Sequence, residues 1–172
     1  MIALCLLGHG FAHAKLAKPQ TANYPDIASF LRSQNITSLD EYISWLSDHV
    51  HYAADDTSDD WADPMHTLNK KSGDCEDLAF LNAEVVKYFG HESQVLAYGH
   101  GKEAHVICLF IKEGKYYIFD NTKFYRDVTS PSLKEIFLFL AKKHEARFLL
   151  KLTRDPKRID VLYTYQGTLS NI

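Results

Sequence analysis

A single cysteine stands where a glycine turn passes into an amphipathic run, and this stretch constrains the chain most. The residues Ser72-Gly73-Asp74-Cys75-Glu76-Asp77 are followed by apolar residues at helical spacing, and the run ends at Gly90. Apolar residues three, four and seven apart mark one face of a helix, and a glycine just past the end is a common stop. The spacing therefore predicts a helix whose first turn contains Cys75.

This position favours a reactive thiol. The first turn of a helix carries unpaired N–H groups and the positive end of the helix dipole, and both favour an anion. We therefore expect the pKa of Cys75 to be lowered, so that a thiolate nucleophile forms more readily. The alternative is a buried cysteine that serves as a small apolar side chain. The polar and acidic neighbours Asp74, Glu76 and Asp77 favour the nucleophile.

Length and composition indicate one globular domain. The chain has 172 residues, of which 46% are hydrophobic and 13% aromatic, enough for one substantial core. The formal net charge is -3, and lysine and arginine are scattered along the chain, so nothing indicates a nucleic-acid surface or a polybasic membrane patch. No apolar run reaches the roughly 18–20 residues of a membrane span.

The N-terminus has features of an export signal. Residues 1–11 are apolar and uncharged, and Ala12-His13-Ala14 fits the pattern before a signal-peptidase cut. The basic n-region is missing and the apolar core is short, which a mis-assigned start codon that removed a longer leader would explain. We predict a signal peptide over 1–14, a single domain over 15–172 and a periplasmic or secreted protein. The alternative is a small buried helix or strand in a cytoplasmic protein.

The remaining pattern predicts an α+β domain, because helical spacing comes first and strand-like alternation later. The expected helices cover about 27–32, 38–52, 75–89 and 132–143, and the expected strands 94–98, 104–111, 115–120, 146–152 and 159–165. Residues 54–60 are expected to form an acidic loop, and 61–71 lack strong periodicity. Glu113-Gly114 predicts a tight hairpin. The antiparallel sheet is expected to bury one face against the Cys75 helix.

Two further side chains supply what a cysteine nucleophile needs, a base and a group that orients the base. His105 begins the second of these strands, and Asp120 ends the third. If residues 111 and 114 pair at the hairpin turn, His105 lies directly opposite Asp120 and on the same face. Taken singly, a satisfied half-buried histidine and a turn acid are equally good interpretations. His100, in a glycine loop, is an alternative base.

The segments Gly73-Asp74-Cys75-Glu76-Asp77, Ala104-His105-Val106 and Phe119-Asp120-Asn121 resemble the transglutaminase-like superfamily, in particular its bacterial cysteine proteinases. The match covers about residues 38–125. The resemblance implies a papain-like fold, with the nucleophile on a helix packed against an antiparallel sheet. It also implies that Cys75 attacks an amide carbonyl, that His105 acts as base and then acid, and that Asp120 holds His105.

The resemblance suggests further site residues. Acyl transfer needs donors for an oxyanion; the backbone N–H of Cys75 is one candidate, and family members often use a side chain upstream of the cysteine, here Trp61. The alternative for Trp61 is an anchor for its loop. The sequence is also similar to periplasmic proteases that clip surface adhesins, in which acids flanking the cysteine take part in calcium binding, and Asp74 and Glu76 match those acids. Calcium prefers 6–8 oxygen ligands. The amide chemistry itself requires no cofactor.

These observations predict a cysteine hydrolase that cleaves peptide or isopeptide amides of a protein or peptide through a thioester. Two alternatives remain open. The same chemistry with an amine acceptor would make the protein a transglutaminase, and a non-catalytic transglutaminase-like module would bind protein or peptidoglycan. Nothing in the sequence indicates an oligomeric state.

Overall fold

The computed structural model describes residues 24–54, 61–155 and 158–165. The expected leader over 1–14 and most of the acidic loop lie outside these residues. The described helices are α1 (Ile27–Ser33), α2 (Leu39–His49), α3 (Pro64–Lys70), α4 (Cys75–Tyr88) and α5 (Leu133–His144). The described strands are β1 (His51–Tyr52), β2 (Ser72–Gly73), β3 (Ser93–His100), β4 (Glu103–Lys112), β5 (Lys115–Asp120), β6 (Lys123–Ser130), β7 (Phe148–Leu152) and β8 (Ile159–Thr164).

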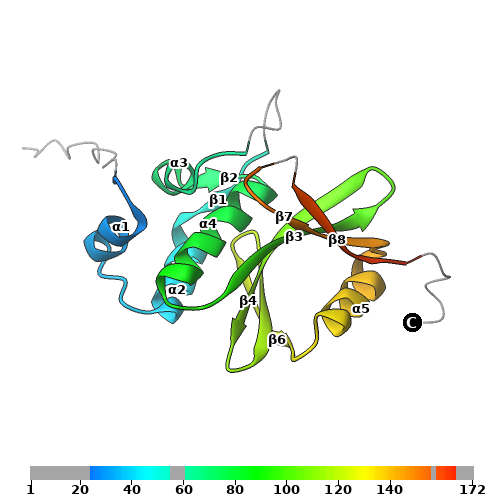
Figure 1. Ribbon diagram of the computed structural model, residues 1–172. Helices are drawn as coiled ribbons and strands as arrows, with labels where there is room; N and C mark the ends of the chain where they lie inside the picture. The colour runs from blue at the N-terminus through cyan, green and yellow to red at the C-terminus, as the bar shows by residue number, and fades with distance from the viewer. Residues whose placement is uncertain (1–23, 55–60, 156–157, 166–172) are drawn as a thin grey trace, which may run out of the picture.

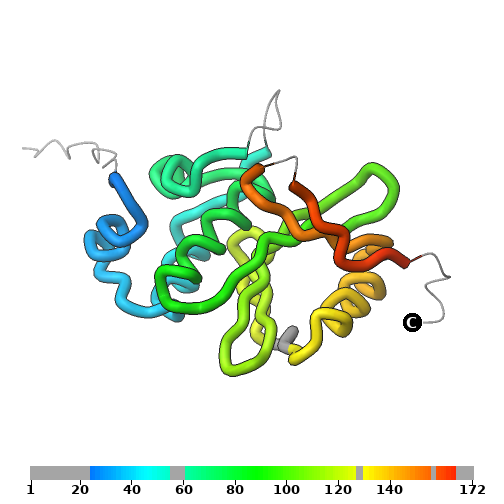
Figure 2. Tube along the Cα trace, viewed as in Figure 1, coloured from blue at the N-terminus to red at the C-terminus, as the bar shows by residue number. Residues whose placement is uncertain are grey.

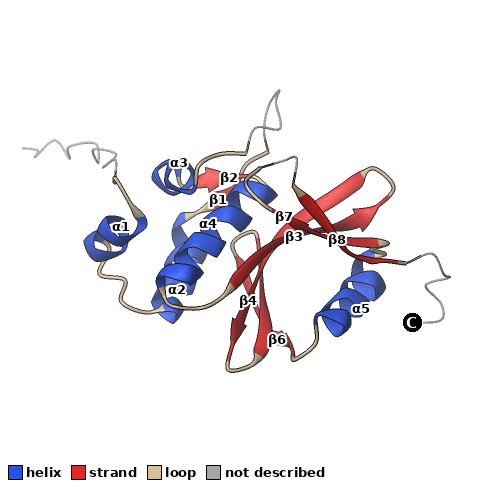
Figure 3. Ribbon diagram, viewed as in Figure 1, coloured by secondary structure: helices blue, strands red, loops and turns tan. Residues whose placement is uncertain are grey.

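An antiparallel sheet of six strands, in the order β6-β5-β4-β3-β7-β8, separates two groups of helices. Helices α1 to α4 lie together on one side of the sheet and α5 lies on the other (Figures 1 and 3). This arrangement confirms the predicted α+β fold with the Cys75 helix packed on an antiparallel sheet. Across the described residues, no helix is long and apolar enough to cross a membrane.

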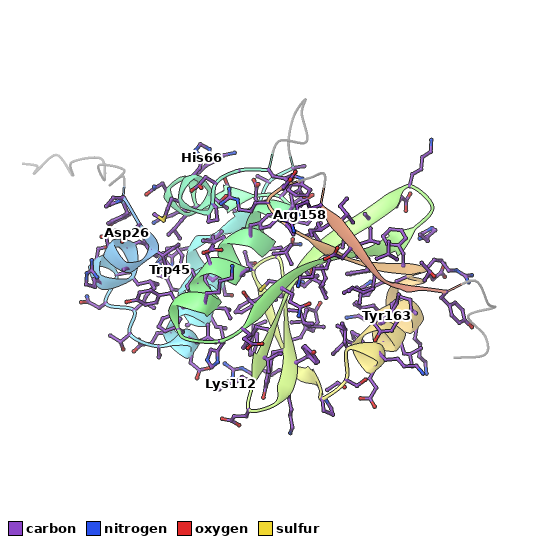
Figure 4. All side chains as sticks on the ribbon, viewed as in Figure 1. Asp26, Trp45, His66, Lys112, Arg158 and Tyr163 are labelled. Atoms are coloured by element: carbon purple, nitrogen blue, oxygen red, sulfur yellow. The ribbon has the colours of Figure 1, made fainter. Side chains whose placement is uncertain are left out.

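Both faces of the sheet are buried, each in its own core. Successive side chains of a strand point to opposite faces, and β4 shows this clearly. Val106 and Cys108 belong to the core beneath α4, whereas Ile107 and Leu109 belong to the core beneath α5. The second core extends to the edge strand β8, where Tyr163 stacks on Phe137 of α5 at 5.4 Å between ring centroids (Figure 4). The sequence predicted the first buried face only.

The helix predicted over 38–52 begins as expected and ends earlier. Its start has a capping box: the Ser38 hydroxyl accepts the N–H of Glu41, and the Glu41 carboxylate accepts the N–H of Ser38. The helix ends at His49, because His51–Tyr52 pair in parallel with Ser72–Gly73. This short pairing fixes the backbone immediately before the Cys75 helix.

Two elements were not predicted as such. Helix α3 lies in the segment that lacks strong periodicity. At its start, the Asp63 side chain is the N-cap and accepts the N–H of Met65, and a proline stands at the first helical position. Strand β6 completes the sheet beyond β5, in a segment for which the sequence predicted no strand.

The β4–β5 hairpin has the predicted turn and a different register. Glu113 and Gly114 have φ of 52° and 72°, the left-handed conformation of a tight hairpin turn. Lys112, at the tip of the hairpin (Figure 4), pairs with Lys115. The predicted pairing of residues 111 and 114 is therefore wrong. Continuing the observed register places Asp120 opposite Ile107 instead of His105. A shift by two residues keeps His105 and Asp120 on the same face, because the side-chain period of a strand is two.

Candidate active site

The residues before and after Cys75 anchor the start of α4. A Cβ at Gly73 would lie 2.7 Å from the Cβ of Asp77, so a side chain has no room there. Asp77 uses its carboxylate to accept the N–H of Ala62 at 2.7 Å, which ties the segment before α3 to the helix. The Asp74 side chain accepts the N–H of Asp77 at 3.5 Å and caps the helix. The motif around Cys75 therefore positions the helix start.

The Cys75 thiol is half-buried and protonated. Its Sγ donates to the Glu76 carboxylate at 3.1 Å. Burial raises the pKa of Cys75 to about 12, the Glu76 carboxylate adds to this effect, and the backbone N–H of Val106, which donates to the sulfur, opposes it. The prediction of a lowered pKa is therefore wrong for this state, because burial and the neighbouring carboxylates of Glu76 and Asp74 outweigh the helix terminus.

His105 and Asp120 form a pair at the end of the sheet. His105 Nε2 lies 2.7 Å from Asp120 Oδ1, and the Tyr125 hydroxyl donates to Asp120 Oδ2 at 3.4 Å. Burial opposes ionisation of Asp120, but the hydrogen bond and charge of His105, together with Tyr125, lower its pKa overall. The carboxylate is therefore ionised at neutral pH and able to stabilise an imidazolium. Since Nε2 is engaged, Nδ1 is the ring nitrogen left for proton transfer.

Tyr98 lies among these groups and was not singled out from the sequence. It pairs with His105 across β3 and β4, and the two rings meet edge to face at 5.5 Å. Burial raises the pKa of Tyr98, and the charges of Asp120, Tyr125 and Cys75 raise it further. Cys75 and Asp120 thus both lie within electrostatic reach of the Tyr98 hydroxyl. A sequence signal existed, because a hairpin turning near Gly101 places Tyr98 beside His105.

His144, the last residue of α5, also reaches this region. Its ring lies 5.4 Å from that of Tyr98. A cavity of about 480 Å³ opens here, bounded by His144, the His105–Asp120 pair and the end of the β3–β4 hairpin. No local pattern in the sequence pointed to His144. His100 lines the same cavity, but the hydrogen bond to Asp120 is made by His105.

The remaining predicted residues lie as follows. The ring of Trp61 packs against Phe80 of α4 at 5.4 Å, which matches the alternative interpretation as an anchor; its oxyanion role stays a prediction. Cys108 is fully buried in the core beneath α4, and it and Cys75 are both free thiols.

A calcium site at Asp74 and Glu76 stays a prediction. Their side chains are engaged with the N–H of Asp77 and with the Cys75 thiol, and the residues are only 8% and 6% exposed. Within the described ranges, no group of three or more His, Cys, Asp or Glu residues is arranged to hold a metal ion. Calcium takes 6–8 oxygen ligands, more than these two side chains supply, and no step of the chemistry is assigned to a metal.

Fold and site together define an α+β protein in which a cysteine at the start of a helix lies next to two adjacent strands, one carrying a histidine and the other the aspartate that pairs with it. No family model and no curated protein matches the sequence. Among solved structures, the chain is similar to calcium-bound LapG from Legionella pneumophila, with 13% identity and a TM-score of 0.48 over 80% of this chain and 77% of that one. It is also similar to a proposed cysteine protease from Cytophaga hutchinsonii, with 14% identity and a TM-score of 0.41 over 74% of this chain and 47% of that one. At these identities the likeness concerns the fold alone.

Proposed function

We propose that this protein is a cysteine-dependent amide hydrolase that acts on a protein or peptide, with Cys75 as nucleophile, His105 as base and then acid, and Asp120 as the group that orients His105. One observation carries the proposal. His105, held by Asp120 at 2.7 Å, precedes Val106, whose N–H donates to the Cys75 sulfur. A nucleophile, a base and an orienting carboxylate in this order are what acyl transfer requires.

The chemistry proceeds in two halves. His105 Nδ1 takes the thiol proton, the sulfur attacks the amide carbonyl carbon, and the carbon–nitrogen bond breaks as His105 returns the proton to the leaving amine. The acyl group is then held as a thioester. His105 next takes a proton from water, the hydroxide attacks the thioester, and the carbon–sulfur bond breaks. The products are an amine, a carboxylic acid and the restored thiol, and Asp120 stabilises the imidazolium in both halves.

The raised pKa of Cys75 fits a thiol that is kept protonated at rest by burial and by Glu76, and that loses its proton to His105 when substrate arrives. Catalytic hydrogen bonds often tighten only when substrate is bound. The developing oxyanion is assigned to the backbone N–H of Cys75, which has no acceptor within the helix at this first position. Trp61 remains the candidate for the second donor.

Comparing single-site variants on native substrates tests the proposal. Wild type, Cys75→Ala and Cys108→Ala are incubated with the native cell-envelope proteins, and new N-termini are mapped by mass spectrometry. We expect the same new termini from wild type and from Cys108→Ala, and none from Cys75→Ala. Identical termini from Cys75→Ala would remove Cys75 as nucleophile. Amine adducts in place of new termini would favour the transglutaminase. If wild type and both variants gave neither new termini nor adducts, the result would favour the binding module.

We further propose that the protein works in the periplasm or outside the cell. The support is the apolar leader with its Ala12-His13-Ala14 site. Intact-mass analysis of the exported protein should give a chain that begins at Lys15. A cytoplasmic protein that retains Met1 would overturn this compartment without touching the chemistry.

A further inference from the structure

We infer that the cavity beside His105 and Asp120 receives the amine side of the scissile amide and selects a basic residue there. The inference rests on the proposed hydrolase and adds to it a substrate class, namely a lysine or arginine immediately after the cleaved bond.

The location of the cavity links it to the leaving amine. Residues of the β3–β4 hairpin and His144 of α5 line it, and the hairpin and α5 lie on the same side of the molecule (Figure 2). His105 and Asp120 line it, whereas Cys75 is not among the described residues around it. During acyl transfer the acyl part of the substrate is bonded to sulfur, and the amine part takes its proton from the histidine. A cavity that borders His105 and leaves out Cys75 is therefore on the amine side.

The charges around the cavity favour a cation. Glu103 and Asp120 contribute carboxylates, and the lowered pKa of Asp120 keeps it ionised. His144 also lines the cavity. Burial and the charge of Lys143 lower its pKa from 6.5, so its ring is mostly neutral at pH 7. The other titratable residues that line the cavity are Tyr98, His100 and His105.

No lysine or arginine is among the described residues that line the cavity, and the charge of His105 acts on Asp120, with which it pairs. The neighbouring Lys143 places its ammonium over the ring of Tyr125, at 4.7 Å from the centroid. A cleft with one sign of charge attracts the opposite sign, and Glu103, at the exposed start of β4, is the carboxylate not engaged with the histidine. An ammonium or guanidinium is the group that complements this cavity, and we assign Glu103 as the residue that determines specificity.

Kinetics on a matched peptide pair tests the assignment. Two peptides from a mapped cleavage site differ only after the scissile bond, with lysine in one and norleucine in the other. For wild type we expect kcat/KM to be about fivefold higher for the lysine peptide, the upper range for an exposed ion pair. Glu103→Gln should bring this ratio close to one. The matched control is Glu113→Gln, an exposed acid at the other hairpin turn, which should leave the ratio unchanged.

A binding measurement separates this inference from the hydrolase. In ¹⁵N-labelled Cys75→Ala protein, N-acetyl-lysinamide should shift the amide resonance of Gly99, which lines the cavity, and N-acetyl-norleucinamide should not. Equal cleavage of both peptides with no shift of Gly99 would overturn the basic preference and leave the hydrolase standing. A lysine-specific shift without cleavage of any peptide would remove the hydrolase and leave a cation-binding cavity. Failure of both measurements would remove both.

Discussion

At Cys75, opposing influences act on one sulfur atom. The helix start and the N–H of Val106 favour the thiolate, whereas burial and the Glu76 carboxylate favour the thiol. The pKa of about 12 shows that burial and the carboxylate outweigh the helix start and the N–H of Val106. The sequence alone places Cys75 at a helix start, because that placement depends on the spacing of apolar residues. It does not determine the protonation state, since that depends on how deeply the sulfur is buried and on where the next side chain points.

We predict that Glu76→Gln increases the rate at which iodoacetamide alkylates Cys75. Removing the carboxylate charge lowers the pKa of the thiol, and each unit of decrease raises the thiolate fraction at neutral pH about tenfold. The rate is measured at pH 7.5 by mass spectrometry of the Cys75 peptide over time. Cys108 is the internal reference, because burial raises its pKa and shields it in both proteins.

The matched control is Glu84→Gln, which removes a carboxylate from the exposed side of the same helix, where it pairs with Lys87. It should leave the alkylation rate of Cys75 unchanged. An equal or slower rate in Glu76→Gln would show that Glu76 does not hold the thiol in solution.

At the scale of the elements, the start of α4 depends on the absence of a side chain at position 73. Gly73→Ala would place a Cβ 2.7 Å from Asp77 Cβ and 2.9 Å from its carboxylate. Overpacking of this kind costs about 1–3 kcal/mol, and it would also strain the contact between Asp77 and Ala62. We expect a lower free energy of unfolding in urea and a loss of activity through displacement of Cys75. Gly114→Ala, in open space but at positive φ, is the control that costs stability without displacing the site.

A buried hydrogen-bond chain joins α4 to the turn that follows Asp120. The Tyr42 hydroxyl donates to Asn82 Oδ1 at 2.8 Å, and Asn82 Nδ2 donates to the carbonyl of Asn121 at 2.9 Å. Tyr42 and Asn82 are fully buried, and Asn82 lies two turns along α4 from Cys75. The chain therefore helps to set the spacing between the cysteine helix and the end of β5.

Tyr42→Phe should destabilise the fold by about 1–3 kcal/mol, because it leaves Asn82 Oδ1 buried without its donor. Urea unfolding followed by circular dichroism measures the loss. The same substitution at Tyr88, which is 48% exposed, should change the free energy of unfolding by much less. If both variants unfold alike, the Tyr42–Asn82 bond contributes nothing in solution.

The elements that the sequence predicted well are those with a strong period. Helix α4 and the hairpin of β4 and β5 have long regular patterns and clear stop signals, and both were placed to within a few residues. Helix α3 has only two turns and no apolar stripe, so its Asp63-Pro64 start was the sole signal. The hairpin register could not be fixed, because the same Glu113-Gly114 pair is compatible with two pairings until side chains on both faces are packed.

At the scale of the whole molecule, the candidate site lies where two cores end. By the alternation of side chains along β4 and β5, His105 and Asp120 belong to the sheet face that α5 covers. Cys75 packs against the core beneath α4, on the other face. The two sides meet at the backbone of Val106, which donates to the sulfur. The order of Cys, His and Asp in the sequence pointed to the first three residues. Tyr98 lies opposite His105 in the β3–β4 hairpin, which local spacing indicates, whereas His144 comes from α5, which only the tertiary packing brings to the site.

This double-sided burial also makes the fold sensitive to alkali. Burial raises the pKa of Cys75, Cys108, Tyr42 and Tyr98 above their ordinary values of 9.0 for cysteine and 10.0 for tyrosine. The folded chain therefore keeps protons that the unfolded chain releases. Stability from these groups is complete below pH 9 and is lost as the pH rises toward the folded pKa values. We expect the free energy of unfolding to fall above about pH 9 and to fall more steeply above about pH 10.

Urea unfolding at several pH values between 7 and 11 measures this slope, to which each such group contributes about 1.4 kcal/mol per pH unit once its unfolded form is ionised. Cys108→Ala isolates one group. It lowers stability at every pH by removing a packed side chain, but it also removes one titrating proton, so its decline above pH 9 should be shallower by that amount. Tyr88→Phe, at an exposed position, should keep the wild-type slope. Parallel curves for wild type and Cys108→Ala would mean that the buried thiol does not hold its proton in the folded protein, and the alkaline loss would then have to come from the tyrosines and Cys75.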